Sequence, residues 1–309
     1  MYYYCIIATL LISFLSSQSY YLTRKRASTG SLSVAPSLGS LGSLGSLGSL
    51  DSEVGMTSPP LTVLFDFDGT VAETEPLILE ASNRMLAQFG IQWSVDQYAS
   101  LLKVGNTEKR LTYWFDKYDC WPECEEDPVA LVRKLKHEKD GHFNTLVEER
   151  SRNGNFQCRP GVLRCMEEAI LALEGRVAIV SNSNTDIVRK QWDALVRDSE
   201  YHYLLDSVKI FGGDLAPDGH RKPHPDLYQI AMSEMGVQKA SDCCVIEDTN
   251  EGMRAAFSAG LSNVIITKNY YTLQDDFTGA AMVLDDLDQG GFSFGNFFHQ
   301  QACFDVQVL

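Results

Sequence analysis

Short apolar runs alternate with longer amphipathic stretches from residue 61 onward. The short runs have the length and the β-branched residues that are typical of buried parallel strands. Helical periodicity lies between the later runs. We therefore predict an α/β fold with a three-layer, doubly wound parallel sheet of the Rossmann type. The predicted strands are 61–65, 177–180, 208–211, 243–246, 264–267 and 281–284, and helices are predicted over 162–173 and 225–235.

The interval between the first two predicted strands has a different pattern. About 110 residues separate these strands, and nearly all show helical periodicity. At roughly 150 residues per domain, the chain of 309 residues has the length of two domains. We predict an inserted α-helical cap over 77–155, within a core of 61–76 and 156–288 that is followed by a tail, 289–309. The helices expected in the interval are 75–89, 95–102, 107–117 and 128–152.

The first 60 residues have the pattern of a targeting leader and a linker. Residues 5–15 form an apolar run that is too short for a membrane-spanning helix, which needs about 20 residues, so we predict a signal peptide. Residues 20–50 are basic and Ser-rich and hold no acidic residue, as is typical of a transit peptide. Together they predict a plastid (chloroplast) leader, with secretion as the alternative. Residues 38–49 repeat Leu-Gly-Ser and indicate a linker.

The rest of the chain is strongly acidic. The net charge is -15, although residues 1–50 hold no Asp or Glu. Nucleic-acid binding depends on basic residues that neutralise phosphates, so this composition excludes nucleic acid as the expected partner. The eight cysteines lack a paired zinc-binding spacing and are too few for a disulfide scaffold, so we expect reduced thiols. We expect a monomer that binds a small molecule and has no stable membrane association once mature.

Chemically active side chains follow four of the predicted strands. In an open parallel sheet, ligands bind outside the carboxyl ends of the strands, so residues at these ends converge on one crevice. Each motif alone is ordinary for a polar turn or a helix cap, whereas all four in this order predict an active site. The residues are Asp66 and Asp68 after the first strand, Ser181 and Asn182 after the second, Lys222 after the third, and Glu247 and Asp248 after the fourth.

The carboxylates of this set predict a bound divalent cation. Carboxylates at close range repel one another unless a cation lies among them, and all-oxygen ligands suit Mg²⁺. Ser181 and Lys222 can hold phosphate oxygens, and Asp66 can attack phosphorus to form an aspartyl-phosphate. Asp68 can protonate the leaving alcohol and then activate water, while the Thr70 hydroxyl can orient the turn. We therefore predict hydrolysis of a phosphate ester.

Four motifs carry a family resemblance: DFDGTVAETE (66–75), VSNSN (180–184), KPHPD (222–226) and VIEDTNEG (245–252). Through them, over about residues 61–287, the chain resembles the haloacid dehalogenase superfamily of aspartate-nucleophile phosphatases. Stretches such as CRPGVLRCMEEA and IEDTNEGMRAAFSAG look like its CbbY-like branch, including plastid members. The resemblance implies a helical cap inserted after the first motif. It also implies removal of phosphate from xylulose 1,5-bisphosphate, an inhibitory sugar bisphosphate that arises around Rubisco.

The resemblance implies a role for each matching residue. Asp66 would be the nucleophile and Asp68 the general acid and base. Glu75 would face the sugar hydroxyls, and Arg110 in the cap would grip a second phosphate with its guanidinium fork. The implied Mg²⁺ ligands are Asp66, the Asp68 backbone carbonyl and Asp248, with Glu247 as a further or outer ligand. The implied substrate-binding residues are Thr70, Glu75, Arg110, Ser181, Asn182 and Lys222.

Two positions depart from the pattern of the CbbY-like branch. The cap loop has NTEKR at 106–110 where a Gly-Gly-Lys-Glu-Arg run is usual, which bears on recognition of the distal phosphate. Ile78 stands where a His is common, and the related β-phosphoglucomutases use a His near that position. A phosphosugar mutase and a non-catalytic sugar-phosphate sensor are the alternatives to a phosphatase. His224, between two prolines, is interpreted as a loop residue, and the Phe-rich tail shows no clear periodicity.

Overall fold

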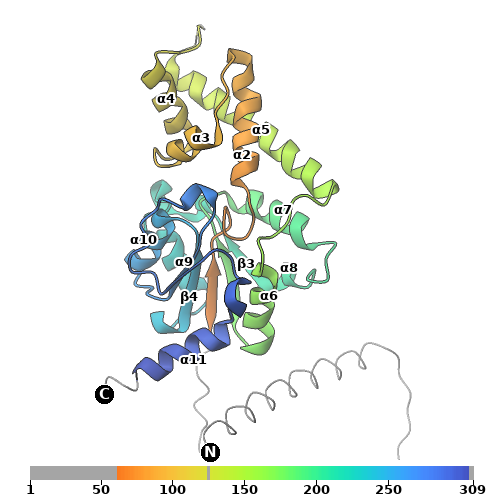
Figure 1. Cartoon of the computed structure of the whole chain (residues 1–309), viewed down its shortest axis with the longest axis vertical. Coiled ribbons are helices and arrows are strands. Elements are labelled where there is room, and N and C mark those ends of the chain that lie inside the picture. The colour runs from red at the N-terminus through yellow and green to blue at the C-terminus, as the bar shows by residue number, and fades with distance from the viewer. Residues whose placement is uncertain (1–60, 124–125, 306–309) are drawn as a thin grey trace, which may run out of the picture. The chain divides into compact units, whose positions relative to one another are not determined.

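A six-stranded parallel sheet forms the centre of the fold. The computed structural model describes residues 61–123 and 126–305, so the predicted leader over residues 1–60 lies outside the described residues. The strand order is β3-β2-β1-β4-β5-β6, and every adjacent pair is parallel, which confirms the doubly wound α/β fold. The strands are β1 (Thr62–Phe65), β2 (Arg176–Val180), β3 (Val208–Phe211), β4 (Cys243–Glu247), β5 (Val264–Thr267) and β6 (Met282–Leu284) (Figure 1).

Strand β1 lies between β2 and β4. Leu64 pairs with Ala178 of β2 and with Val245 of β4. The residue after β1, Asp66, donates its backbone N–H to the Ile246 carbonyl at 2.9 Å. The ends of β1, β2 and β4 are therefore neighbours, and the residues that follow these strands are brought to one place.

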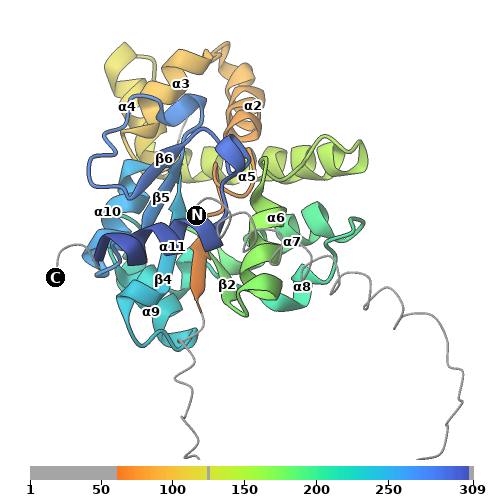
Figure 2. The ribbon, with the colours of Figure 1, turned by 60° about the horizontal axis from the view of Figure 1, so that its bottom comes forward.

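Helices cover both faces of the sheet. Alternate residues of β1 belong to different apolar clusters, with Val63 and Phe65 in one and Leu64 in the other. Figure 2 shows α9 and α10 on one side of the strands and α6 and α7 on the other. The helices of the core are α6 (Val162–Glu167), α7 (Thr185–Val196), α8 (Leu204–Ser207), α9 (Asp226–Glu234), α10 (Asn250–Ser258) and α11 (Phe294–Asp305). The short 3-10 turns of the core are η3 (Gly213–Leu215), η4 (Pro217–Gly219), η5 (Ala240–Asp242), η6 (Tyr270–Thr272) and η7 (Gln289–Gly291).

The interval between β1 and β2 is helical, as its periodicity predicts. Helices α2 and α5 lie side by side, and α4 packs against α5 (Figure 1). Their apolar faces meet in a cluster of their own that includes Trp93, Tyr98 and Phe115. Ser94 forms a capping box at the start of α3, and Asp127 caps α5. The cap elements are α2 (Glu75–Leu86), η1 (Ala87–Phe89), α3 (Val95–Leu102), α4 (Thr107–Tyr118) and α5 (Pro128–Arg152).

The two chain segments that connect the cap to the core are bonded to each other. Ala72 forms an antiparallel bridge with Cys158, and the Arg159 N–H donates to the Val71 carbonyl at 2.8 Å. Leu77, in the first turns of α2, belongs to the same apolar cluster as one face of the sheet. Because this cluster continues across the connections, the domain boundaries at 76/77 and 155/156 stay predictions.

Two predicted helices do not stay α-helical to the ends that their apolar pattern predicts. The helix predicted over 162–173 is α-helical only to Glu167 and continues as a single π-helical turn, η2 (Glu168–Ala172). The helix predicted over 75–89 is α2 followed by the 3-10 turn η1, and Gly90 terminates it at a φ of 67°. Apolar spacing predicts which residues are buried, but not whether the last turn tightens or widens.

The part of the predicted tail over residues 292–298 packs on the core. Phe294 and Phe297 are buried, and the Phe294 ring packs edge to face on Phe65 of β1 with centroids 6.4 Å apart. Phe292, which precedes α11, is buried in the same cluster. The buried Phe residues thus lie partly before and partly within the helix, which explains why they follow no single helical period.

Two composition-based expectations concern membranes and thiols. In residues 61–123 and 126–305, no helix combines the length and the apolar character needed to cross a membrane. Five cysteines are free thiols, as predicted: Cys120, Cys158, Cys165, Cys243 and Cys244. Burial raises the pKa of the Cys158 thiol to about 12, so this group stays protonated at neutral pH.

Candidate active site

Three buried carboxylates gather at the carboxyl ends of β1 and β4. The ligand atoms of Asp66, Glu247 and Asp248 lie within 4.8 Å of one another. Lys222 reaches them from the loop after β3, with its Nζ 2.6 Å from Asp66 Oδ1 and 2.7 Å from Glu247 Oε1. All four residues are at most 7 % exposed. The structure thus brings together the side chains predicted from three strand ends, which we call the acid cluster.

Burial controls ionisation in the acid cluster. Desolvation raises the pKa of Asp66 to about 8, and the positive charge of Lys222 only partly opposes this. Desolvation also raises the pKa of Asp248, and the charges of Asp66 and Glu247 raise it further. Burial lowers the pKa of Lys222, but the attraction of Asp66 and Glu247 outweighs burial and the net change is upward. One ammonium group does not neutralise three carboxylates, so the donor set fits an additional divalent cation.

Glu247 is fully hydrogen-bonded. Its Oε1 accepts from Lys222 Nζ at 2.7 Å and from the Tyr228 hydroxyl at 2.7 Å. Its Oε2 accepts from the Asp248 N–H at 3.2 Å and from Thr249 Oγ1 at 3.3 Å. Lys222 Nζ also lies 4.8 Å from the centroid of the Tyr228 ring. Because each of its oxygens already accepts two hydrogen bonds, Glu247 is better suited to orient Lys222 than to bind a metal directly.

Asp68 lies beside the acid cluster and is only half-buried. Its Oδ1 accepts from Thr74 Oγ1 at 2.9 Å, and its Oδ2 accepts from Ser181 Oγ at 3.1 Å and Ser183 Oγ at 2.9 Å. Three hydroxyl groups from two segments therefore fix the orientation of this carboxyl group. A carboxyl held in this way can give or take a proton at a defined position.

A tight loop after β1 brings the backbone close to Asp248. Gly69 has a φ of 88°, and a Cβ atom there would lie 2.2 Å from Asp248 Oδ2, so only glycine fits. Thr70 Oγ1 donates to Asp248 Oδ1 at 3.3 Å, and Asn269 Nδ2 donates to Asp248 Oδ2 at 2.6 Å. The Thr70 hydroxyl therefore orients a carboxylate. Its predicted contact with substrate stays a prediction.

The Lys222 loop is held by Asn182. The side-chain Oδ1 of Asn182 accepts from the Lys222 N–H at 2.8 Å, and its Nδ2 donates to the Lys222 carbonyl at 3.3 Å. Lys222 Nζ also donates to the Val180 carbonyl at the end of β2, at 2.6 Å. Asn182 was predicted to bind substrate, and in the structure its amide group positions the lysine, so substrate binding by Asn182 stays a prediction.

The two cap residues predicted to bind substrate meet through a tyrosine. Glu75, the first residue of α2, accepts a hydrogen bond from the Tyr98 hydroxyl at 2.6 Å. Arg110 of α4 lies over the Tyr98 ring, with Cζ 5.7 Å from the ring centroid, and its Nη1 donates to the same hydroxyl at 3.4 Å. Burial raises the pKa of Glu75, and Arg110 opposes that rise. Arg110 Nε is buried and has no hydrogen-bond partner among the described residues, so this guanidinium keeps donor capacity.

Sequence reasoning missed three residues around the site. Asn269 lies two residues beyond the end of β5, so the strand-end rule that found the other groups applies to it as well. Tyr228 belongs to the apolar stripe of α9, where an aromatic residue indicates a core position. Arg159 is 6 % exposed, and its guanidinium donates to the backbone carbonyls of Gly69, Thr267, Lys268 and Asp285.

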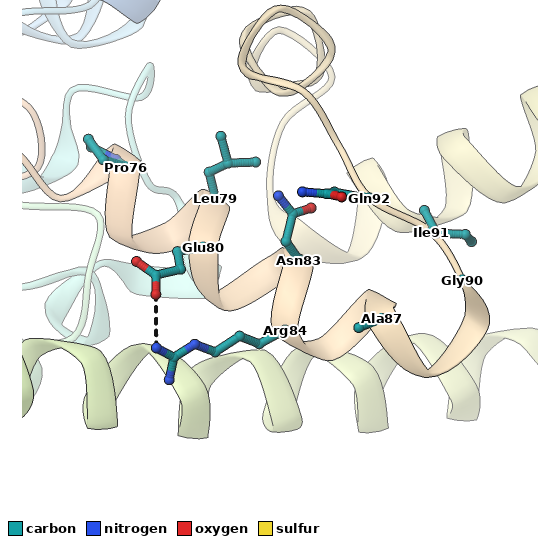
Figure 3. A pocket seen from close by; sticks show the side chains of 9 residues that line it. All are labelled: Pro76, Leu79, Glu80, Asn83, Arg84, Ala87, Gly90, Ile91 and Gln92. Atoms are coloured by element: carbon teal, nitrogen blue, oxygen red, sulfur yellow. Dashed lines mark hydrogen bonds and ion pairs between the residues drawn. The ribbon is translucent and has the colours of Figure 1, made fainter.

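A hollow of about 690 Å³ lies in the cap, beside α2 and residues 90–92 (Figure 3). Its lining includes Glu80 and Arg84, which are joined by an ion pair of 2.8 Å. The described residues that line it include none of the predicted site residues. The acid cluster, and not this hollow, therefore has the chemistry of an active site.

The fold and the acid cluster together define a class of protein: phosphoric monoester hydrolases built on a doubly wound parallel sheet, with buried carboxylates at the end of the central strand. Comparison with known families makes this more specific. A family model of haloacid dehalogenase-like hydrolases matches residues 61–260, and the chain belongs to this family.

Several relatives of the chain are CbbY proteins. The CBBY-like protein of Arabidopsis thaliana is 32% identical over 237 residues, which cover 74% of this chain and 70% of the relative. Protein CbbY of Cupriavidus necator is 32% identical over 234 residues, which cover 73% of this chain and 85% of the relative. A crystal structure of a CbbY mutant from Rhodobacter sphaeroides in complex with xylulose-(1,5)bisphosphate superimposes with a TM-score of 0.63 at 27% identity, covering 77% of this chain and 99% of that chain. The predicted CbbY-like resemblance and phosphoric monoester hydrolase activity are confirmed.

Proposed function

We propose that the chain is a Mg²⁺-dependent sugar bisphosphate phosphatase that acts on xylulose 1,5-bisphosphate or a closely similar ketose bisphosphate. The observation that carries the proposal is the contact of Lys222 with Asp66 inside the acid cluster. This contact fixes one carboxylate oxygen of Asp66. The Asp66 carboxylate is buried beside those of Glu247 and Asp248, and the three together need a cation. The complex of the Rhodobacter relative with xylulose-(1,5)bisphosphate supports the choice of substrate.

Asp66 is the proposed nucleophile. Its carboxylate attacks phosphorus, an O–P bond forms, and the bond between phosphorus and the sugar oxygen breaks. Asp68 protonates the departing sugar oxygen, which leaves as an alcohol. Lys222 and Ser181 donate hydrogen bonds to the phosphate oxygens as charge shifts onto them.

The second step removes the phosphoryl group from Asp66. Asp68, which is now a carboxylate, accepts a proton from water, and the water oxygen forms a new bond to phosphorus. The bond between phosphorus and the Asp66 carboxylate breaks, which releases inorganic phosphate and restores both aspartates. The hydrogen bonds from Thr74 and Ser183 keep Asp68 in position for both proton transfers.

Three groups are the proposed Mg²⁺ ligands: the carboxylates of Asp66 and Asp248 and the backbone carbonyl of Asp68. The raised pKa values of both carboxyl groups support this set, since a cation would favour their ionised forms. The bound ion would neutralise negative charge on the phosphate. Glu247 acts as an outer group that orients Lys222.

The cap supplies the proposed sugar and distal-phosphate contacts. Glu75 faces the sugar hydroxyls, and Arg110 holds the second phosphate. The buried, unpartnered Nε of Arg110 supports this role. The altered loop at 106–110 keeps this arginine even though it lacks the glycine pair of the branch. The leader pattern and the plant relative support import into a plastid.

Phosphate release from xylulose 1,5-bisphosphate and ribulose 1,5-bisphosphate, measured side by side with Mg²⁺ or with EDTA, tests the proposal. We expect turnover that EDTA abolishes. The isosteric Asp66→Asn variant should lose at least about a thousandfold in kcat/KM. Arg110→Gln should raise KM for the bisphosphate far more than for a sugar monophosphate, which has no distal phosphate.

Three outcomes would contradict the proposal. Turnover that survives Asp66→Asn would exclude this nucleophile. Formation of a sugar-phosphate isomer without free phosphate would indicate a mutase. Tight Mg²⁺-dependent binding without any turnover across a substrate panel would indicate a sensor.

A further inference from the structure

We infer that the loop around Lys222 carries a second metal site, formed by His220, His224 and Asp226, for a late first-row divalent ion such as Zn²⁺ or Cu²⁺. One ligand atom from each of the three residues lies within 4.8 Å of the others. The residues lie outside the acid cluster, and no step of the proposed hydrolysis uses them. The sequence alone indicated only a loop residue at His224, because it does not show that His220 and Asp226 lie beside it.

The three side chains face one another at the surface. The rings of His220 and His224 stack with centroids 4.7 Å apart and planes 13° from parallel. The nitrogen lone pairs lie in the ring planes, so one ring must turn before both can bind the same ion. His220 Nδ1 lies 3.5 Å from Asp226 Oδ1, which is long for a hydrogen bond. The side chain of His220 is 48 % exposed, so it can rotate toward a shared ion without disturbing the core.

The backbone that carries these side chains is well supported. The His220 N–H donates to the Pro217 carbonyl at 2.9 Å, and the His224 N–H donates to the Arg221 carbonyl at 3.0 Å. Between the two histidines, the backbone of Lys222 is hydrogen-bonded to both the Oδ1 and the Nδ2 atom of Asn182. A supported backbone lowers the entropy lost when an ion gathers the side chains.

The donor atoms determine which metal is expected. Two imidazole nitrogens and one carboxylate oxygen suit Zn²⁺, Cu²⁺ and Ni²⁺, and Cu²⁺ binds most tightly to such sites. The acid cluster offers only oxygen atoms, which suit Mg²⁺. The two sites therefore differ in chemistry, and excess Mg²⁺ can occupy the acid cluster while the histidine site stays open to Cu²⁺.

Metal binding would tie together the two ends of the Lys222 loop. His220 directly follows η4, and Asp226 is the first residue of α9. The folded loop already holds the backbone of these residues, so an ion held by both should bind the folded chain more tightly than the unfolded one and should raise the unfolding temperature.

Electron paramagnetic resonance of the full chain with one equivalent of Cu²⁺ and excess Mg²⁺ tests the site directly. We expect nitrogen superhyperfine coupling from two imidazoles. His220→Ala and His224→Ala should each reduce the coupling to that of a single nitrogen and weaken Cu²⁺ binding by about tenfold or more. The double variant should lose both the coupling and the rise in unfolding temperature that Zn²⁺ gives the wild type.

His142→Ala is the matched control, because His142 also lies near a carboxylate, with Nε2 4.0 Å from Glu138 Oε1. It should leave the spectrum and the affinity unchanged. An oxygen-only Cu²⁺ spectrum, or unchanged affinity in the double variant with wild-type circular dichroism, would overturn the inference. The signal does not depend on catalysis, so loss of this site and failure of the proposed phosphatase reaction are separate results.

Discussion

Replacing Arg159 should lower the free energy of unfolding more than replacing an exposed arginine, because the buried Arg159 guanidinium joins three separate segments. Nη1 donates to the carbonyls of Gly69 and Thr267 at 2.5 and 2.9 Å, and Nη2 donates to those of Lys268 and Asp285 at 2.6 and 2.8 Å. These carbonyls belong to the loop after β1, the end of β5 and the segment after β6. Arg159→Met keeps most of the aliphatic stem and removes all of these bonds.

The expected loss follows from the number of acceptors left without a donor. The bonds to Gly69 and Thr267 are buried, whereas those to Lys268 and Asp285 are partly buried. A buried carbonyl that loses its partner costs on the order of 1 kcal/mol and a partly exposed one costs less, so the four together amount to about 3 kcal/mol. This is a large part of a typical unfolding free energy of about 5–15 kcal/mol. The ion pair of Arg159 Nε with Glu73, at 2.9 Å, adds little because the Glu73 side chain is 47 % exposed.

Arg164→Met is the matched control, since Arg164 also bonds two backbone carbonyls, those of Leu287 and Phe292. Its side chain is 41 % exposed, so water can replace the lost bonds and we expect a loss of only about 1 kcal/mol. Urea unfolding followed by circular dichroism measures both variants. The reasoning is refuted if Arg159→Met and Arg164→Met differ by less than about 1 kcal/mol.

Two further predictions concern the loop after β1 and the dependence of fold stability on pH below 7. Gly69→Ala should lower Mg²⁺-dependent activity by tenfold or more, on the order of 1.4 kcal/mol, because its Cβ would displace the Asp248 carboxylate. Gly90→Ala, at a similar φ of 67° but in open space, should affect only stability, and equal activities would contradict this. Burial raises the pKa of Asp140, but Lys139 and a second lysine outweigh burial and lower it. A carboxyl group whose pKa is lowered by folding stabilises the fold at pH values above its ordinary pKa, which is near 4. This stabilisation is lost as the pH falls below that value and the group takes up a proton. Asp140→Asn should therefore lower the unfolding temperature slightly at pH 7 and by a decreasing amount as the pH is lowered below 4, with an effect under about 1 kcal/mol because the carboxylate is partly exposed.

The strand ends explain why much of the site could be predicted from the sequence. Apolar runs identify the strands, and parallel strands end on the same edge of a sheet. Asp66 and Asp248 therefore had to be neighbours once the strand order brought β1 beside β4. Lys222 follows β3, two strands away from β1, and reaches Asp66 through the long loop that carries it. The link between Glu75 and Arg110 was harder to predict, because it runs through Tyr98, an aromatic residue with the pattern of a core position.

Other parts of the site depend on backbone contacts that no residue pattern encodes. Arg159 binds carbonyl groups, which every residue has, so its sequence neighbours do not reveal its partners. Asn182 shows the same limit: its position after β2 predicted contact with a ligand, whereas its amide group bonds the backbone of Lys222. The Phe residues around α11 lack a single period because burial begins before the helix does.

The bridge between Ala72 and Cys158 has an evolutionary consequence. It brings the entry and exit of the inserted helices to neighbouring points, so a shorter or longer insertion can begin and end there without moving any strand of the sheet. Selection can then exchange the inserted helices as a unit, while the acid cluster keeps its geometry. The range of substrates can therefore change through such replacement without any change in the residues of the acid cluster.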